Sequence, residues 1–184
     1  MNTHIALLRG VNVGGHQKVP MTDLRALVAK LGFADVRSLL HSGNLVFRSD
    51  GPSGSGASAE IERLLRAELK KRVGIDTDFF VRSASEWKAV IAKNPFRKEA
   101  ERDPAHLAAM FLKDAPTAKQ VAALEQAIVG RETFRVEGRL AYIVYPDGTG
   151  NSKLTSALID RKFETRGTGR NWNTVLKLAT MSEE

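Results

Sequence analysis

The order in which strand-like and helix-like patterns alternate most constrains the fold of this chain. Four short apolar runs and two stretches with apolar residues at helical spacing share the first half. In chain order they are strand 4–9, helix 21–31, strand 35–40, strand 44–48, helix 61–73 and strand 77–82. This βαββαβ order predicts a ferredoxin-like lobe over residues 1–82. A βαβ crossover joined to a hairpin makes the first two strands parallel, with the third antiparallel between them.

The second half has a related order of elements, although its residues do not visibly repeat those of the first. The patterns predict strand 106–112, helix 117–129, a hairpin of strands 133–136 and 140–145, helix 152–162 and a last helix 172–181. This arrangement is βαββα with an extra C-terminal helix. We therefore expect an α+β chain with two lobes, at residues 1–82 and 106–184.

Residues 83–105 are expected to connect the two lobes. Ser83 and Glu86 have the spacing of a capping box that opens a helix, and Pro95 disfavours its continuation. The charged residues 97–105 are predicted to form a loop. Another loop is predicted at the Gly/Ser-rich residues 51–56, whose composition is typical of flexible segments.

The composition indicates a folded protein without membrane spans or disulfides. Hydrophobic residues make up 42% of the 184 positions, which suffices for one large core or two small ones. No stretch approaches the roughly 18 to 20 apolar residues of a membrane span, and no basic-then-apolar leader is visible. We therefore expect no membrane partner and a cytoplasmic location. The absence of cysteine excludes disulfides, thiolate metal sites and a cysteine nucleophile.

The net charge of +7 favours an anionic partner, such as nucleic acid, a nucleotide or a phosphorylated metabolite. A solubilising surface charge is the alternative interpretation. The positive excess is densest toward the C-terminus, where the only acidic neighbours are Asp160 and Glu164. The basic residues there are Lys153, Arg161, Lys162, Arg166, Arg170 and Lys177.

A glycine-rich loop, RGVNVGG at 9–15, follows the first predicted strand. It lacks the Lys and Ser/Thr of a P-loop and the glycine spacing of a dinucleotide-binding turn. In the predicted topology it shares one sheet edge with the turn HSGN at 41–44, and this edge is rich in backbone donors and amide groups. The alternative is structural, with asparagines forming their own turns and glycines supplying positive φ. The candidate ligand-binding residues at this edge are Arg9, Asn12, Gly14, Gly15, Ser42 and Asn44.

A second glycine-rich turn, PDGTGNSK at 146–153, is predicted to lead straight into helix 152–162. Free amides at that helix N-terminus, together with Ser152 and Lys153, would form an anion site. An ordinary helix with Asn151 or Ser152 as N-cap is the alternative.

The segment RNW at 170–172 opens the last predicted helix. Asn171 is expected to cap this helix, and Trp172 is expected to anchor it in a core rather than to stack on a ligand. Arg170 is the functional candidate among the three residues.

No catalytic set is visible in the sequence. The histidines at 4, 16, 41 and 106 lack metal-ligand spacing, so we expect neither a metal nor a cofactor, and whether the chain is an enzyme stays open.

The element order of the first lobe also matches RNA-recognition modules. Their stacking platform is poorly supplied here, because strands 4–9 and 44–48 contain a single aromatic side chain from Phe, Tyr or Trp, that of Phe47.

Five segments along the chain form a recognisable set: LLRGVNVGG at 7–15, LHSGNLVF at 40–47, NPF at 94–96, YPDGTGNSKLT at 145–155 and TGRNWNTVLKL at 168–178. Together they resemble a bacterial family, domain of unknown function 1697 (DUF1697), over essentially the whole chain. The resemblance implies two α+β halves with ferredoxin-like character, and it implies no activity, cofactor or substrate. It draws attention to Arg9, Asn12, Gly14, Gly15, Ser42, Gly43, Asn44, Ser152, Lys153, Arg170, Asn171 and Trp172.

The leading hypothesis is a cytoplasmic protein that binds a phosphorylated or other anionic small ligand in a cleft between its two lobes. Arg9, Asn12 and Asn44 would come from the first lobe, and Lys153 and Arg170 from the second. One alternative is a non-sequence-specific nucleic-acid-binding protein that uses the basic C-terminal third. Another is a protein-interaction module with no small ligand. The oligomeric state stays open.

Overall fold

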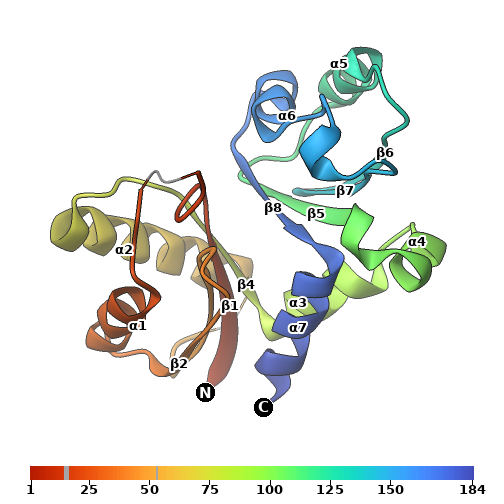
Figure 1. The fold of residues 1–184 in the computed structure, drawn as a ribbon. Coiled ribbons are helices and arrows are strands. Elements are labelled where there is room, and N and C mark those ends of the chain that lie inside the picture. The colour runs from red at the N-terminus through yellow and green to blue at the C-terminus, as the bar shows by residue number, and fades with distance from the viewer. Residues whose placement is uncertain (15–16, 53) are drawn as a thin grey trace. The chain divides into compact units, whose positions relative to one another are not determined.

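The structure is a computed structural model that describes residues 1–14, 17–52 and 54–184. It is an α+β protein with two four-stranded antiparallel sheets and, in the described residues, seven α-helices (Figure 1). The chain divides into a first unit, Met1–Ala89 with Lys177–Glu184, and a second unit, Val90–Leu176. Among the described residues no helix is both long and apolar enough to cross a membrane.

The first unit contains one complete sheet with two helices between its strands. Its elements are β1 (Asn2–Leu8), α1 (Met21–Lys30), β2 (Ala34–Leu39), β3 (Asn44–Ser49), α2 (Ser55–Val73) and β4 (Phe79–Ser83). The strand order in the sheet is β2-β3-β1-β4. Because β1 and β2 are each antiparallel to β3, they run parallel to each other, which confirms the predicted relation of the first three strands.

Helices α1 and α2 pack on one face of this sheet (Figure 1). Leu24 and Val28 of α1 are spaced one helical turn apart, as are Leu65 and Leu69 of α2, and all four are buried. They form one core with sheet residues such as Phe47. Because each buried aliphatic side chain contributes roughly 1.5–3 kcal/mol, this shared core is the main stabilising contact of the unit.

The second unit has the same relative strand order. Its elements are the end of α3 (Ala84–Ala92), α4 (Arg97–Arg102), β5 (Leu107–Leu112), α5 (Ala118–Ala127), β6 (Thr133–Glu137), β7 (Leu140–Val144), α6 (Ser156–Phe163), β8 (Gly167–Asn171) and the start of α7 (Trp172–Glu183). The sheet order is β6-β7-β5-β8. Leu124 of α5 and Ile159 and Phe163 of α6 are buried in one core with this sheet.

Strand β8 was not predicted, so the expected βαββα order of the second half is wrong. The sequence of β8, GTGRN, contains no apolar run, and the strand is held by antiparallel pairing with β5. A Cβ at Gly167 would lie 2.9 Å from Leu112 Cδ2 and 3.0 Å from Met110 Sδ. Glycine therefore allows a close approach that a hydrophobic pattern cannot reveal.

Two predicted loops are partly helical. The charged segment 97–105 contains α4 and most of a 3₁₀ turn, Pro104–His106. Charge indicated a solvated loop, but Arg, Lys, Glu and Ala are also strong helix formers. Helix α2 begins at Ser55, inside the predicted flexible loop 51–56.

The predicted capping residues of two helices are confirmed. The Glu86 carboxylate accepts a hydrogen bond from the Ser83 N–H (2.7 Å), and the Ser83 hydroxyl accepts one from the Glu86 N–H (3.2 Å). At the start of α7, the Asn171 side-chain oxygen accepts a hydrogen bond from the Thr174 N–H (3.0 Å).

Candidate functional site

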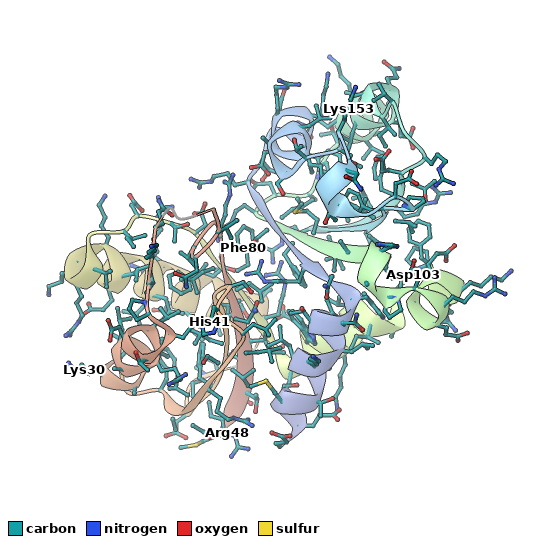
Figure 2. All side chains as sticks on the ribbon, viewed as in Figure 1. Lys30, His41, Arg48, Phe80, Asp103 and Lys153 are labelled. Carbon is teal, nitrogen blue, oxygen red and sulfur yellow. The ribbon has the colours of Figure 1, made fainter. Side chains whose placement is uncertain are left out.

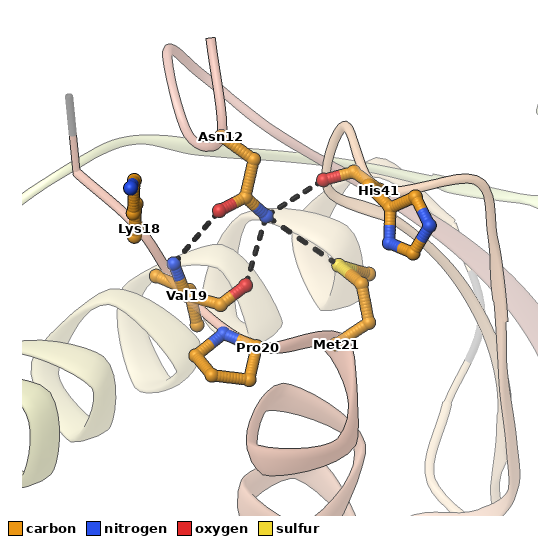
Figure 3. A pocket seen from close by; sticks show the side chains of 6 residues that line it. All are labelled: Asn12, Lys18, Val19, Pro20, Met21 and His41. Carbon is orange, nitrogen blue, oxygen red and sulfur yellow. Dashed lines mark hydrogen bonds between the residues drawn. The ribbon is translucent and has the colours of Figure 1, made fainter. Parts of the chain in front are cut away.

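The loop after β1 is held by the side chain of Asn12. Its Oδ1 accepts a hydrogen bond from the Val19 N–H (2.9 Å), and its Nδ2 donates to the carbonyl oxygens of Val19 (2.8 Å) and His41 (2.6 Å). Asn12 has a φ of 55°, a left-handed conformation that asparagine tolerates better than most residues. One amide therefore joins three segments: the glycine-rich loop, the approach to α1 and the turn between β2 and β3 (Figure 3).

The other predicted asparagine of this edge, Asn44, is fully buried. Its Nδ2 donates hydrogen bonds to the Leu39 carbonyl oxygen and to the Ser42 hydroxyl, both at 3.0 Å. These bonds span the turn between β2 and β3, so Asn44 and Ser42 have a structural role in the turn.

Gly43 lets this turn lie against the end of β1. It has a φ of 75°, and a Cβ at this position would lie 2.7 Å from Val11 Cγ2 and 2.8 Å from Leu8 Cβ. The Gly43 carbonyl oxygen also accepts a hydrogen bond from the Leu8 N–H (2.8 Å). A side chain would disrupt this packing.

The remaining predicted residues of this edge are Arg9, Gly14 and Gly15. Arg9 is anchored through its backbone, because its carbonyl accepts a hydrogen bond from the Thr77 hydroxyl (2.6 Å) and its N–H donates to the backbone carbonyl oxygen of Asp78 (3.0 Å). Gly14 is described and has a φ of 60°. Gly15 lies outside the described residues.

A pocket of about 340 Å³ opens beside the Asn12 amide. Lys18 and His41 lie on opposite sides of that amide (Figure 3), and both side chains are exposed. Neither forms an ion pair with another described residue, and no carboxylate is among the lining residues. We call this cavity the Lys18 pocket; it is lined by Asn12, Lys18, Val19, Pro20, Met21 and His41.

The sequence patterns place the turn that contains His41 at this candidate ligand surface, but they do not single out Lys18. Lys18 stands outside the glycine-rich motif, two residues before the Pro20 that precedes α1. The sequence signal that could have indicated Lys18 is its place in the segment between β1 and α1. This segment must run back past the sheet edge at which β1 ends, so a basic residue in it can lie near the glycine-rich loop. Only the hydrogen bonds of Asn12 show that this return brings Lys18 near the turn at His41.

In the second unit, the predicted helix start near Ser152 is wrong. Helix α6 begins at Ser156, and the Thr155 hydroxyl caps it by accepting a hydrogen bond from the Leu158 N–H (3.2 Å). Ser152 instead bonds to the Glu132 carboxylate and accepts a hydrogen bond from the Leu154 N–H (3.0 Å). A serine and a threonine near a helix start are both good caps, and sequence could not choose between them.

Lys153 is exposed in the segment between β7 and α6 (Figure 2). It precedes the cap residue Thr155 rather than lying in the first turn of the helix. The backbone amides expected to form an anion site with Lys153 therefore do not stand at the N-terminus of α6. They belong to a segment that includes a short 3₁₀ turn, Thr149–Asn151.

Arg170 lies in β8 and donates hydrogen bonds to the Thr168 hydroxyl and to the Gly169 carbonyl oxygen, both at 2.8 Å. Burial lowers the pKa of Arg170 to about 10, so the side chain keeps its charge at neutral pH. The neighbouring Trp172 is buried, and its ring centroid is 6.2 Å from that of Tyr142. Trp172 thus has the expected anchoring role.

The candidate residues belong to different units. Arg9, Asn12 and Asn44 lie in the first, and Lys153 and Arg170 lie in the second. The predicted cleft that would combine them stays a prediction.

A family model matches this chain, and a solved structure has a similar fold. No curated protein matches the chain. A solved structure of similar fold is that of the conserved bacterial protein SP0830 from Streptococcus pneumoniae, which is 24% identical, with a TM-score of 0.74 and coverage of 98% of each chain. The model of the protein family of unknown function DUF1697 matches residues 1–142. Because this match covers most of the 184 residues, the chain belongs to the DUF1697 family.

Proposed function

We propose that this protein binds a small anionic ligand, such as a phosphorylated metabolite or a nucleotide, in the Lys18 pocket. One observation carries the proposal: the pocket combines the Lys18 ammonium and the His41 imidazole with no carboxylate among its lining residues. An ammonium supplies up to three hydrogen-bond donors with a full positive charge, and an imidazole can donate one or two. Such a set favours phosphate or carboxylate groups.

The surroundings of the pocket support the same class of ligand. The hydrogen bonds of Asn12 hold the walls in place before a ligand arrives, which reduces the ordering cost of binding. A volume of about 340 Å³ lies at the small end of the range for ligand sites. The net charge of +7 attracts anions over longer distances.

Both units are assigned to the ferredoxin-like arrangement as part of this proposal. The assignment is supported by the βαββαβ element order of each unit and by the equivalent strand orders, β2-β3-β1-β4 and β6-β7-β5-β8. In this arrangement the loop after the first strand and the turn between the second and third strands meet at one sheet edge. The Lys18 pocket lies at that edge.

The test is a thermal-shift screen followed by calorimetric titration of every hit. The probes are inorganic phosphate, nucleotides, phosphorylated metabolites and short oligonucleotides. Lys18→Ala is expected to weaken binding of a phosphorylated hit about tenfold, because a charge-assisted hydrogen bond contributes roughly 1.5 kcal/mol. His41→Ala is expected to weaken it less. The matched control is Lys30→Ala, which removes an exposed lysine at the end of α1 and should leave binding unchanged (Figure 2).

Salt dependence separates this proposal from the nucleic-acid alternative. Saturable stabilisation by a small phosphorylated compound supports the Lys18 pocket. If only oligonucleotides bind, and their affinity falls steeply as salt rises, the basic C-terminal third becomes the better candidate. A small-molecule hit that binds both pocket variants as tightly as the parent protein overturns the proposed site.

A further inference from the structure

Each sheet has two edge strands, and three of the four edges are blocked by features of the fold. On β4, the Val81 N–H donates a hydrogen bond to the Glu62 carboxylate of α2 (2.7 Å). On β8, the Gly167 N–H donates one to the Asp160 carboxylate of α6 (3.0 Å). In both units a helix thus supplies an acidic side chain that occupies an edge amide. Such devices prevent another strand from pairing with the edge.

Strand β2 is blocked in another way. Its pairing with β3 shifts register between Ala34 and Arg37, and Asp35 within this irregularity has a φ of 49°. A bulge of this kind twists the edge and interrupts the row of outward-facing backbone groups.

Strand β6 occupies the position equivalent to β2 but lacks these features. Its five residues pair with β7 in unbroken register, and residues 138–139 form the turn between them. Hydrogen bonding alternates along an antiparallel pair, and the residues next to a two-residue turn bond to each other. The backbone groups of Phe134 and Val136 therefore point away from β7.

These outward backbone groups are largely unused. The Phe134 carbonyl accepts a hydrogen bond from the Arg135 guanidinium (2.9 Å). Within the described part of the chain, the Phe134 N–H and both backbone groups of Val136 have no hydrogen-bond partner. Three of the four outward backbone groups of Phe134 and Val136 are thus open to pairing with an extended chain, and the fourth is bonded to Arg135.

Two cavities of about 480 and 210 Å³ run beside this edge, between α5 and β6. They share Glu125, Phe134 and Arg135, so they form one continuous surface, which we call the β6 groove. Its larger part is lined mostly by small or apolar side chains, including Val121 and Val136. Glu125 is exposed where the two cavities meet and forms no ion pair with any described residue.

We propose that the β6 groove binds an extended peptide segment that carries an apolar and a basic side chain two positions apart and adds to the sheet as a fifth strand. Hydrogen bonds to Phe134 and Val136 would supply the backbone pairing. Alternate side chains of such a strand point to the α5 face of the sheet, where the larger cavity accepts an apolar group and Glu125 accepts a basic one. This inference does not depend on the ligand proposed for the Lys18 pocket.

The test uses a fluorescein-labelled, N-acetylated octapeptide, Thr-Val-Thr-Lys-Thr-Val-Thr-Lys, whose valine and lysine side chains lie on one face of a strand. The control octapeptide has glutamate in place of each lysine. Fluorescence anisotropy is expected to show saturable binding of the lysine peptide and at least tenfold weaker binding of the glutamate peptide. Glu125→Lys, at an exposed helix position that leaves the fold intact, should reverse this preference. The matched control Glu60→Lys makes the same charge change on α2 and should leave it unaltered.

Backbone pairing has its own readout. Hydrogen exchange of the Val136 amide should slow at least tenfold when the lysine peptide binds, whereas that of Arg135, which already faces β7, should change little. Val136→Pro removes the outward N–H and should abolish binding without disturbing the pairing with β7.

Three outcomes overturn the proposal. Equal affinity for the two peptides shows that Glu125 does not select the partner, and binding without protection of Val136 excludes strand addition. A concentration-dependent dimer that Val136→Pro dissociates assigns the edge to a second copy of this chain instead.

Discussion

The two units share a strand order but differ in how their equivalent hairpins are packed. In the first, the turn between β2 and β3 lies so close to Leu8 and Val11 that no Cβ fits at Gly43. In the second, a Cβ at Gly138, in the turn between β6 and β7, would meet nothing within 4 Å. The same topology therefore produces a closely packed turn beside the Lys18 pocket and an open one beside the β6 groove. Equivalent positions of one topology can therefore differ in the surface that they offer to a ligand.

The largest expected effect comes from replacing each of these two glycines with alanine and comparing the losses of stability. Gly43→Ala should destabilise the protein by about 3 kcal/mol, because the residue has a left-handed φ and its Cβ overlaps Val11 and Leu8. Gly138→Ala should cost only about 1 kcal/mol, since it has a left-handed φ but open space. Urea denaturation measures both variants. Equal losses would show that the turns are packed alike.

The Asn12 amide should matter more than the asparagine of the second glycine-rich turn. Asn12→Ala removes three hydrogen bonds to backbone groups and should cost about 2 kcal/mol. Asn151 donates one exposed hydrogen bond, to the backbone carbonyl oxygen of Asp147 (3.2 Å), so Asn151→Ala should cost no more than about 0.5 kcal/mol. The midpoint of thermal unfolding measures the difference. A larger loss for Asn151→Ala would contradict the structural role given to Asn12.

Helix capping also differs between the units. Thr117 and Thr155 cap α5 and α6 with their side chains, whereas α1 and α2 follow Pro20 and Gly54 without a side-chain hydrogen bond. Thr155→Ala should cost about 1 kcal/mol. Urea denaturation gives this value, and Thr155→Ser is the control that retains the hydroxyl. If the serine variant loses as much as the alanine variant, the hydroxyl is not the stabilising group.

The smallest expected effect is the pH dependence due to His4, a fully buried histidine of the first unit. Its Nε2 is 2.8 Å from the Ser49 hydroxyl, and its Nδ1 has no hydrogen-bond partner in the described part of the chain. Burial lowers the pKa of His4 below 6.5, against a smaller opposing effect of the Glu86 charge.

Because the unfolded state binds this proton more tightly, the contribution of His4 is fully present above pH 6.5 and is lost as the pH falls. The loss is at most about 1.4 kcal/mol per pH unit. Urea midpoints at pH 7.5 and 5.5 should therefore differ less in His4→Gln than in the parent protein. An identical difference in both proteins would mean that other groups cause the pH dependence. The histidine of the second unit, His106, is exposed beside Asp103 and provides no equivalent group.

The elements that could be predicted from the sequence are those whose side chains show a period. The helical spacing of Leu65 and Leu69, for example, depends only on neighbours along the chain. Strand β8 could not be predicted, because its pairing rests on backbone groups and on the small size of Gly167 against Leu112. The start of α6 could not be predicted either, since Ser152 and Thr155 are both acceptable caps.

The candidate site shows the same limit. Asn12 and the turn at His41 could be placed at one edge from strand order alone, and the structure brings them together through a hydrogen bond of 2.6 Å. The sequence could not show that the Asn12 amide already forms hydrogen bonds with backbone groups, because its partners are not adjacent to it in sequence. The role proposed for Lys18 became visible only with that connection.

The element order of the first unit, the caps at Ser83 and Asn171 and the net charge were readable from the chain itself, because periodicity and composition are local properties. The tertiary structure decided the rest. It brought Lys18 and His41 to one pocket, placed Gly43 where no side chain fits, and left the β6 edge without a bulge or a helix carboxylate on its outward amides. Each of these depends on which distant segments pack together, and packing is set by the balance of contacts over a whole unit rather than by any one motif.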